Sequence, residues 1–188
     1  METLEARLDK VESELRGLRD RQEIMDCAAN HARGCDRHDS ELLAGVYHDG
    51  GFDEHGFAIN PGPEYYKWAK EQHGRGSTHS LHHITHQIAD IDGDEAHVES
   101  YVIGLMMNPD GKTARLLSGR YIDRMEKRDG KWGIVIRRST VEVIMMADAS
   151  IITSPAFAQF GYLKGMRDKR DLSYRRPLTM EDEGHERW

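Results

Sequence analysis

Three Asp-Gly pairs divide the second half of the chain at regular intervals: Asp92-Gly93, Asp110-Gly111 and Asp129-Gly130. The segments around them alternate with a period of two, at about residues 80–91, 95–107, 113–127 and 131–145. Asp-Gly supplies the positive φ angles of a tight hairpin turn, and a period of two is typical of a β-strand. The pattern therefore predicts an antiparallel meander of four long strands.

The first part of the chain has a helical period instead. Its apolar residues recur at alternating steps of four and three: Leu4, Leu8, Val11, Leu15 and Leu18. This heptad seam with charged flanks predicts one long helix over residues 3–32, with Thr3 as its N-cap and Glu5 in its first turn. Two interpretations of the seam are open. It packs on its own domain as part of a solvated helix, or it is an arm that contacts another subunit.

Two shorter helices are expected before the strands. Asp39 or Ser40 caps the first of them, which includes Tyr47 and ends at "HDGG". A turn and another short helix occupy residues 57–74, and this helix carries Tyr65, Tyr66 and Trp68. Because helices come first and an antiparallel sheet follows, the predicted class is α+β.

The composition fits one domain with an extension at each end. We expect an N-terminal helical arm, an α+β domain and a C-terminal tail, at residues 1–20, 21–150 and 151–188. A net charge of −7 disfavours nucleic acid as a partner. No apolar run approaches the roughly 18 residues of a membrane span, and the charged N-terminus is unlike a signal peptide. Two cysteines give no disulfide framework, so we expect a cytoplasmic protein.

Five of the chain's 11 histidines lie close together: His79, His82, His83, His86 and His97. On a helix, the first four would share one face and could bind a metal ion. On a strand, His82 and His86 share a face but lie about 13 Å apart at roughly 3.3 Å per residue. The period of two favours the strand, so no metal site is predicted. It places His82, Ile84 and His86 together on the concave, core side.

His82 has two interpretations. A lone histidine on an apolar face is usually a core residue with a satisfied hydrogen bond. The alternative depends on Asp36, which follows the first helix among small and apolar neighbours. A carboxylate against an imidazole fixes its tautomer and favours its protonated form, as in a general base. The sequence by itself does not bring Asp36 and His82 together.

Three segments carry a resemblance to a known family: "RQEIMDCAANHARGCDRHD", "LHHITHQIADIDGDEAHVESY" and "SGRYIDRMEKRDGKWGIVIRR". Their order and spacing resemble the SnoaL-like branch of the nuclear transport factor 2 superfamily. The resemblance implies a cone-shaped α+β barrel over residues 21–150, in which a curved antiparallel sheet and N-terminal helices enclose an apolar pocket. Enzymes of this branch include scytalone dehydratase, hexachlorocyclohexane dehydrochlorinase and bile-acid dehydratase, and many of its members are trimers.

The resemblance also implies catalytic residues. Asp36 and His82 match the Asp-His pair of the dehydratase and dehydrochlorinase members, and Thr85 and His86 complete the local pattern. His31 stands where relatives often have a tyrosine acid, so it either takes over that role or marks a lost or changed activity. The expected substrate-binding residues are Tyr47, His86, Ser100, Tyr121 and Arg137. For Arg137, an ion pair with Asp123 or Glu99 is an open alternative.

Three functions are considered. The first is a cofactor-free lyase, a dehydratase or a related enzyme that releases halide or formaldehyde from a hydrophobic small molecule such as a steroid, terpenoid, polyketide or aromatic dimer. The second is an isomerase or cyclase with the same fold. The third is a non-catalytic assembly subunit or ligand carrier. The resemblance implies a homo-oligomer, with a trimer favoured, and no metal or cofactor.

Overall fold

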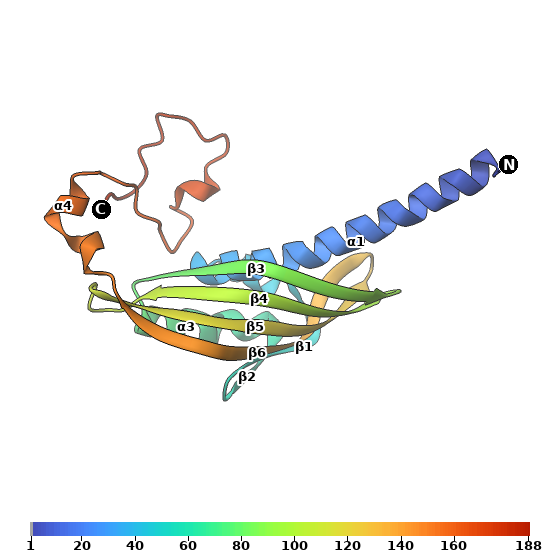
Figure 1. Cartoon of the computed structure of the whole chain (residues 1–188), viewed down its shortest axis with the longest axis horizontal. Helices are drawn as coiled ribbons and strands as arrows, with labels where there is room; N and C mark the ends of the chain where they lie inside the picture. The colour runs from blue at the N-terminus through green and yellow to red at the C-terminus, as the bar shows by residue number, and fades with distance from the viewer. Residues whose placement is uncertain (1) are drawn as a thin grey trace.

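The computed structural model describes residues 2–188 and has helices before and after a single sheet (Figure 1). The α-helices are α1 (Leu4–Asp36), α2 (Ser40–Ala44), α3 (Tyr65–Gly76) and α4 (Pro155–Ala158). The strands are β1 (Tyr47–His55), β2 (Ala58–Pro61), β3 (His79–Asp92), β4 (Glu95–Met107), β5 (Thr113–Arg128) and β6 (Lys131–Asp148). Short 3₁₀ helices occur at Gly62–Glu64, Ser150–Thr153 and Leu172–Tyr174.

The sheet is curved and open, with the strand order β2-β1-β6-β5-β4-β3. Strands β3 to β6 form the predicted antiparallel meander, and the predicted α+β class is confirmed. Strand β1 joins the sheet parallel to β6, beyond the meander. Helix α1 runs along β3 and α3 lies against the concave side, so the helices and the sheet together form the cone.

The hairpin of β1 and β2 was not expected, and Tyr47 begins a strand instead of lying on the second helix, which ends at Ala44. Two properties of β1 make it difficult to recognise as a strand from the sequence. Gly50 has a φ of 77° and the register shifts between Tyr47 and Phe52, so the alternation is broken. Its buried inward residue is Asp53, whereas Phe52 is exposed, which inverts the usual apolar-in pattern.

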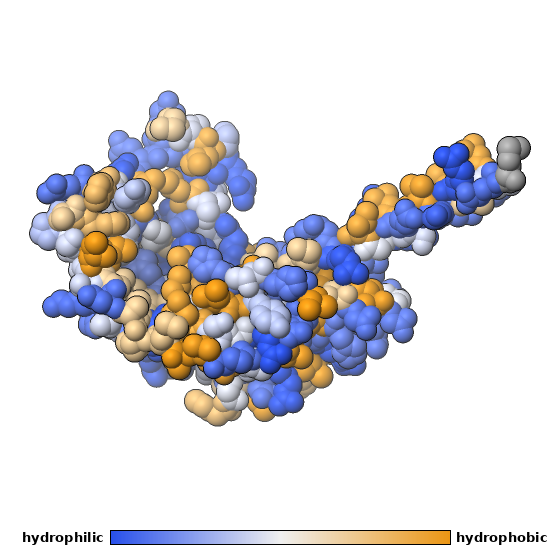
Figure 2. Space-filling model, in the orientation of Figure 1, coloured by the Kyte–Doolittle hydropathy of each residue, from blue (hydrophilic) through white to orange (hydrophobic). Residues whose placement is uncertain are grey.

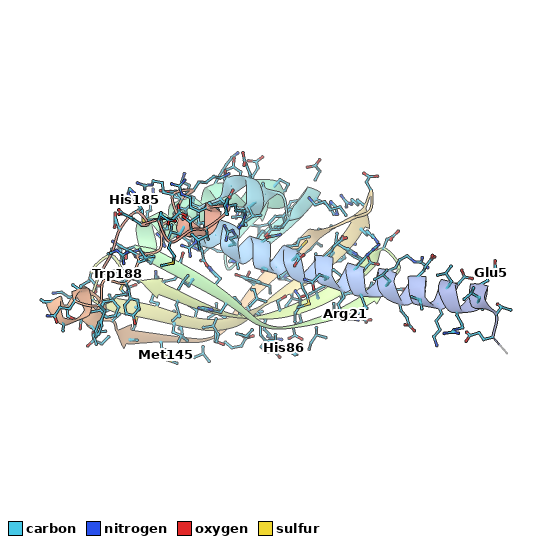
Figure 3. The ribbon with its side chains drawn as sticks, turned by 90° about the horizontal axis from the view of Figure 1, so that it is seen from above. Glu5, Arg21, His86, Met145, His185 and Trp188 are labelled. Atoms are coloured by element: carbon cyan, nitrogen blue, oxygen red, sulfur yellow. The ribbon has the colours of Figure 1, made fainter. Side chains whose placement is uncertain are left out.

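A β-bulge in β3 reverses the side on which the later histidine lies. The register shifts between Ile84 and His86, which leaves Thr85 as an extra residue opposite β4. Such an insertion moves every following side chain to the other face. The prediction that His86 shares the concave face with His82 is therefore wrong: His86 is exposed on the outer face beside Tyr101 (Figure 3).

The core fills the space between the helices and the concave side of the sheet. Its largest members include Trp132, Tyr65, Ile24, Met125 and Ile134, each almost fully buried. Each such side chain contributes about 1.5–3 kcal/mol of burial free energy. Because α1 and α3 supply part of this core, their positions relative to the sheet are fixed, and with them the site described below.

The two ends of the chain extend beyond the cone (Figure 1). The first part of α1 projects away from it, and Thr3 caps this helix as predicted. The tail after β6 is largely irregular and is held to the first helices by Tyr174, which donates to Asp39 at 2.7 Å, and by Arg37, 3.5 Å from Asp171. The three-part division at residues 20 and 150 stays a prediction. Within residues 2–188 no helix is long and apolar enough to cross a membrane.

Candidate active site

A cavity of about 400 Å³ lies between α3 and the concave side of the sheet. Strands β4, β5 and β6 supply an apolar wall, and α3 supplies Trp68 and His73. The residues that line it are His55, Trp68, Gln72, His73, Arg75, Gly76, His82, Val102, Gly104, Met106, Arg115, Leu117, Gly119, Tyr121, Thr140 and Val141. The volume is in the range of small-molecule sites.

The fold brings Asp36 into contact with His82, which lines this cavity. Asp36 is the last residue of α1, and His82 lies near the start of β3, which runs beside that helix. The Nδ1–H of His82 donates to Asp36 Oδ1 at 2.7 Å, and the backbone N–H of His82 donates to Oδ2 at 2.8 Å. Both side chains are largely buried, with exposed fractions of 9% for His82 and 8% for Asp36.

This geometry determines the tautomer of His82. An ionised carboxylate only accepts hydrogen bonds, so the proton of the neutral ring is held on Nδ1 and Nε2 keeps its lone pair. The ring of His73 stacks on that of His82 at 5.4 Å. Burial, followed by the nearby His82, lowers the pKa of His73 to about 3, so His73 is neutral. The pair can therefore accept a proton at Nε2 while Asp36 stabilises the resulting charge.

A second histidine–carboxylate pair, His55 with Asp53, was missed in the sequence. Nδ1 of His55 contacts Asp53 Oδ1, and the hydroxyl of Tyr47 donates to Oδ2. The other ring nitrogen of His55 lies 3.0 Å from Ser139 Oγ and 3.3 Å from the hydroxyl of Tyr65. An Asp-x-His spacing on a strand puts both side chains on one face, but β1 itself was not recognised. His55 lines the same cavity as His82.

His31 does not reach the cavity. Its ring is fully buried and packs against Tyr65 and Tyr121, each 5.4 Å away between ring centroids. Burial, and then the charge of Arg137, hold the pKa of His31 well below its usual value. Its Nε2 lies 3.8 Å from Asp53 Oδ2, beyond hydrogen-bond distance. His31 is thus a neutral core imidazole beneath the site.

The predicted substrate-binding residues separate into three groups. Tyr121 lines the cavity, and burial raises the pKa of its phenol, which therefore stays protonated. Tyr47, Ser100 and Arg137 are buried outside the cavity lining. His86 lies on the outer face.

Arg137, expected to bind substrate, instead makes an ion pair with Asp123, one of the two partners that the sequence left open as an alternative. The bond is bidentate, with Nε and Nη2 donating at 2.8 and 2.6 Å, and both side chains are buried. The guanidinium also lies 4.2 Å from the centre of the Tyr121 ring. Arg137 therefore supports the position of Tyr121 through packing and charge.

Arg115, which lines the cavity, was not among the predicted site residues. Its Nη2 donates to the carbonyl of Gly76 at 2.6 Å, at the end of α3. Its buried Nε has no hydrogen-bond partner among the described residues. Nothing in its local sequence distinguishes Arg115 from the other basic residues of the sheet, since its role depends on the end of α3.

The described part of the chain contains no group of three or more His, Cys, Asp or Glu side chains placed to hold a metal ion. The cavity instead gathers His82 and His55, each held by a carboxylate, together with the phenol of Tyr121. Such a set can remove a proton from a bound molecule and donate a hydrogen bond to an oxygen or halide on it.

The chain is similar to known proteins in both sequence and fold. A family model described as "SnoaL-like domain" matches residues 16–138, whereas among curated proteins none matches the chain significantly. Of the solved structures, LinA is 21% identical, with a TM-score of 0.67 over 71% of this chain and 92% of that one. The hexachlorocyclohexane dehydrochlorinase LinA-type3 from Novosphingobium barchaimii is 20% identical, with a TM-score of 0.65 over 71% and 94%. A candidate scytalone dehydratase from Novosphingobium aromaticivorans is 21% identical, with a TM-score of 0.62 over 69% and 89%.

Proposed function

Because the chain belongs to the SnoaL-like domain family, we propose that it is a cofactor-free lyase whose general base is His82, oriented by Asp36. The observation that carries this proposal is the pair of hydrogen bonds that the ring and the backbone N–H of His82, a cavity-lining residue, donate to the carboxylate of Asp36. His82 also lines the cavity, so its ring lies where a bound molecule would be.

In the proposed reaction, Nε2 of His82 takes a proton from a C–H bond made acidic by a neighbouring carbonyl or halogen. The electron pair of that bond forms the new double bond, and the leaving hydroxide or halide departs from the adjacent carbon. Asp36 stabilises the imidazolium that forms. General acid–base catalysis of this kind contributes about 10²–10⁴-fold.

The leaving group needs a hydrogen-bond donor. Tyr121 is our candidate, because its phenol is protonated, lines the cavity and has its ring 5.9 Å from that of His55. His31 was the candidate acid from the sequence, but it does not line the cavity. His55, held by Asp53, would exchange protons with the leaving group as water forms.

The substrate class follows from the cavity wall. Val102, Met106, Leu117 and Val141 form an apolar surface opposite Trp68, which supports a hydrophobic small molecule. Arg115 would bind an acceptor oxygen of that molecule. Release of formaldehyde from a hydroxymethyl-bearing diaryl compound would use the same base on an O–H proton. The O–H electron pair would form the C=O bond of formaldehyde, and the electron pair of the cleaved C–C bond would take up a proton from the imidazolium of His82.

An isomerase or cyclase is the second candidate, and the presence of His55 on the same cavity favours it. A second imidazole can return a proton to a different atom of the substrate, so that nothing is lost. The two candidates differ in one readout, which is the release of water, halide or formaldehyde.

The test is a screen of hydrophobic β-hydroxy ketones, alkyl halides and hydroxymethyl diaryl compounds, with detection of each released product. We expect one class to react, and His82→Ala to abolish the reaction. His83→Ala is the matched control, because His83 is the next residue of β3 and is exposed on the outer face. Turnover that survives His82→Ala would refute the proposal. We also propose a cytoplasmic location, which the two free thiols of Cys27 and Cys35 support.

A further inference from the structure

The projecting part of α1 carries an apolar seam that nothing in the described chain covers. All residues from 2 to 19 are exposed, and the seam residues have exposed fractions between 44% and 82%: Leu4, Leu8, Val11, Leu15 and Leu18. Figure 2 shows apolar side chains along this projecting helix, and Figure 3 shows it leaving the body between Arg21 and Glu5. The alternative that the seam packs on its own domain is therefore wrong.

The seam and the core-facing side of α1 are different faces of one helix. The body is reached at Asp20, which accepts from Lys127 at 2.6 Å and from Trp132 at 2.9 Å. Beyond it, Ile24 and Cys27 turn into the core. At 3.6 residues per turn, the seam lies roughly 170° around the helix from this core stripe. The body thus leaves the seam open to another helix.

An apolar seam at steps of four and three is the pattern of a coiled coil. Leu8 and Leu15 occupy the a positions of the heptad, and Leu4, Val11 and Leu18 occupy the d positions. An isolated helix of this length is only marginally stable in water, so the projecting segment gains from a partner that buries the seam.

The flanking charges identify that partner. In a parallel, in-register pair, the g residue of one helix faces the e residue of the next heptad on the other helix. Every such pair here is of opposite charge: Arg7 with Glu12, Glu14 with Arg19, and Arg21 with Asp26. A copy of the same helix therefore matches both the apolar seam and all three flanking pairs.

We propose that residues 4–26 form a parallel, in-register coiled coil with a second copy of this chain. The bodies then lie at the same end of the coil, and their cavities remain on the concave sides of their sheets. This proposal does not depend on the catalytic role of His82, since the arm has no residue in the cavity. A third copy can join the same seam, and the measured mass gives the number.

The first test is the mass of the full chain by light scattering or sedimentation. Wild type should be an oligomer, and the double variant Leu8→Glu/Leu15→Glu should be a monomer with an unchanged circular dichroism spectrum for its body. The matched control is Ala6→Glu/Ser13→Glu, which adds the same charges at the two f positions on the opposite side of the helix. It should keep the wild-type mass.

Orientation and register have their own tests. Glu14→Arg or Arg19→Glu alone should weaken association several-fold, and the two together should restore it. Leu15→Cys should form a disulfide between copies, since like a positions meet only in a parallel coil, whereas Ser13→Cys should not. The native Cys27 and Cys35 are buried and should not interfere.

Three outcomes would overturn the proposal. One is a wild-type chain that is monomeric at all concentrations. The second is an oligomer whose mass is the same in wild type and in the seam variants. The contact between copies would then be made by exposed apolar residues of the outer sheet face, such as Leu105 and Met145. The third is the absence of a disulfide in Leu15→Cys under oxidising conditions.

Discussion

Two buried imidazoles, those of His31 and His73, should make the folded protein lose stability as the pH falls below about 6.5. Burial is the main cause of their low pKa values, because the charged ring loses its solvating water. The positive charge of Arg137 lowers the pKa of His31 further, and His82 lowers the pKa of His73 further. The pKa of His73 falls to about 3, and that of His31 lies well below its usual value.

The sign and size follow from proton binding in the two states. An unfolded chain binds a proton at each ring with a pKa of about 6.5. Between that pH and the folded pKa values the unfolded state binds more protons, so the stabilisation present above pH 6.5 is lost as the pH falls. Each ring then costs up to about 1.4 kcal/mol per pH unit. From pH 7.5 to 5.5, the titration of His73 should therefore lower the free energy of unfolding by roughly 1 kcal/mol, and the titration of His31 should act in the same direction.

The assay is urea unfolding at pH 7.5, 6.5 and 5.5. His73→Phe should reduce the pH dependence, and His31→Phe should do the same if it folds. His83→Ala should keep the full dependence, because this ring is exposed on the outer face. Carboxyls with lowered pKa values, such as Asp168 with a pKa of about 2, change the free energy of unfolding only below roughly pH 5. A flat profile in wild type, or the same slope without His73, would refute the reasoning.

Three further predictions concern single contacts. Asp36→Asn should lower turnover of an identified substrate by about 10²–10⁴-fold and the free energy of unfolding by about 1.5–3 kcal/mol. The reason is that an amide oxygen and nitrogen cannot both accept, so one of the two N–H groups of His82 loses its partner. Steady-state kinetics and urea unfolding that match wild type would contradict this. Arg137→Met should cost about 3–5 kcal/mol in urea unfolding by leaving Asp123 as a buried, unpaired charge, and adding Asp123→Leu should recover most of it. If the double variant is no more stable than the single one, the ion pair is not the cause. Arg115→Gln should weaken the binding of a carboxylate-bearing cavity ligand about tenfold more than that of its neutral amide, measured by titration calorimetry; an equal loss for both ligands would remove Arg115 from the site.

The sheet could be predicted because its signals are local. Three Asp-Gly turns separate the four strands of the meander, and each strand lies within a few residues of its predicted range. The sheet face on which each side chain lies was harder to predict, because it depends on an uninterrupted alternation along the whole strand. One extra residue at Thr85 moved His86 from the cavity side to the outer face.

The pairing of Asp36 with His82 could be proposed from the sequence, although spacing alone does not determine it. The two residues are 46 positions apart, and only the packing of α1 along β3 brings them within 2.7 Å. The pairing was expected from the resemblance to the family, in which an Asp and a His at these positions form a pair. The same reasoning failed for His31, because its helix face turns towards the core and away from the cavity.

The second imidazole could not be found without β1. A strand that buries Asp53 and exposes Phe52 contradicts the rule that apolar residues face inward. The burial is tolerated because the Asp53 carboxylate accepts from Tyr47 and contacts His55. Such a contact network is formed by residues of several elements, so neither its members nor Arg115 show a pattern in the chain.

The measurement that tests the central claim most directly is the exchange of an acidic C–H proton of a cavity-bound ketone with deuterium from the solvent, followed by NMR. It reports proton abstraction alone, whether or not a group is then lost. Exchange should be catalysed by wild type, slowed about 10²–10⁴-fold by His82→Ala, and unchanged by His83→Ala. Catalysed exchange of equal rate in wild type and His82→Ala would show that the imidazole beside Asp36 is not the base.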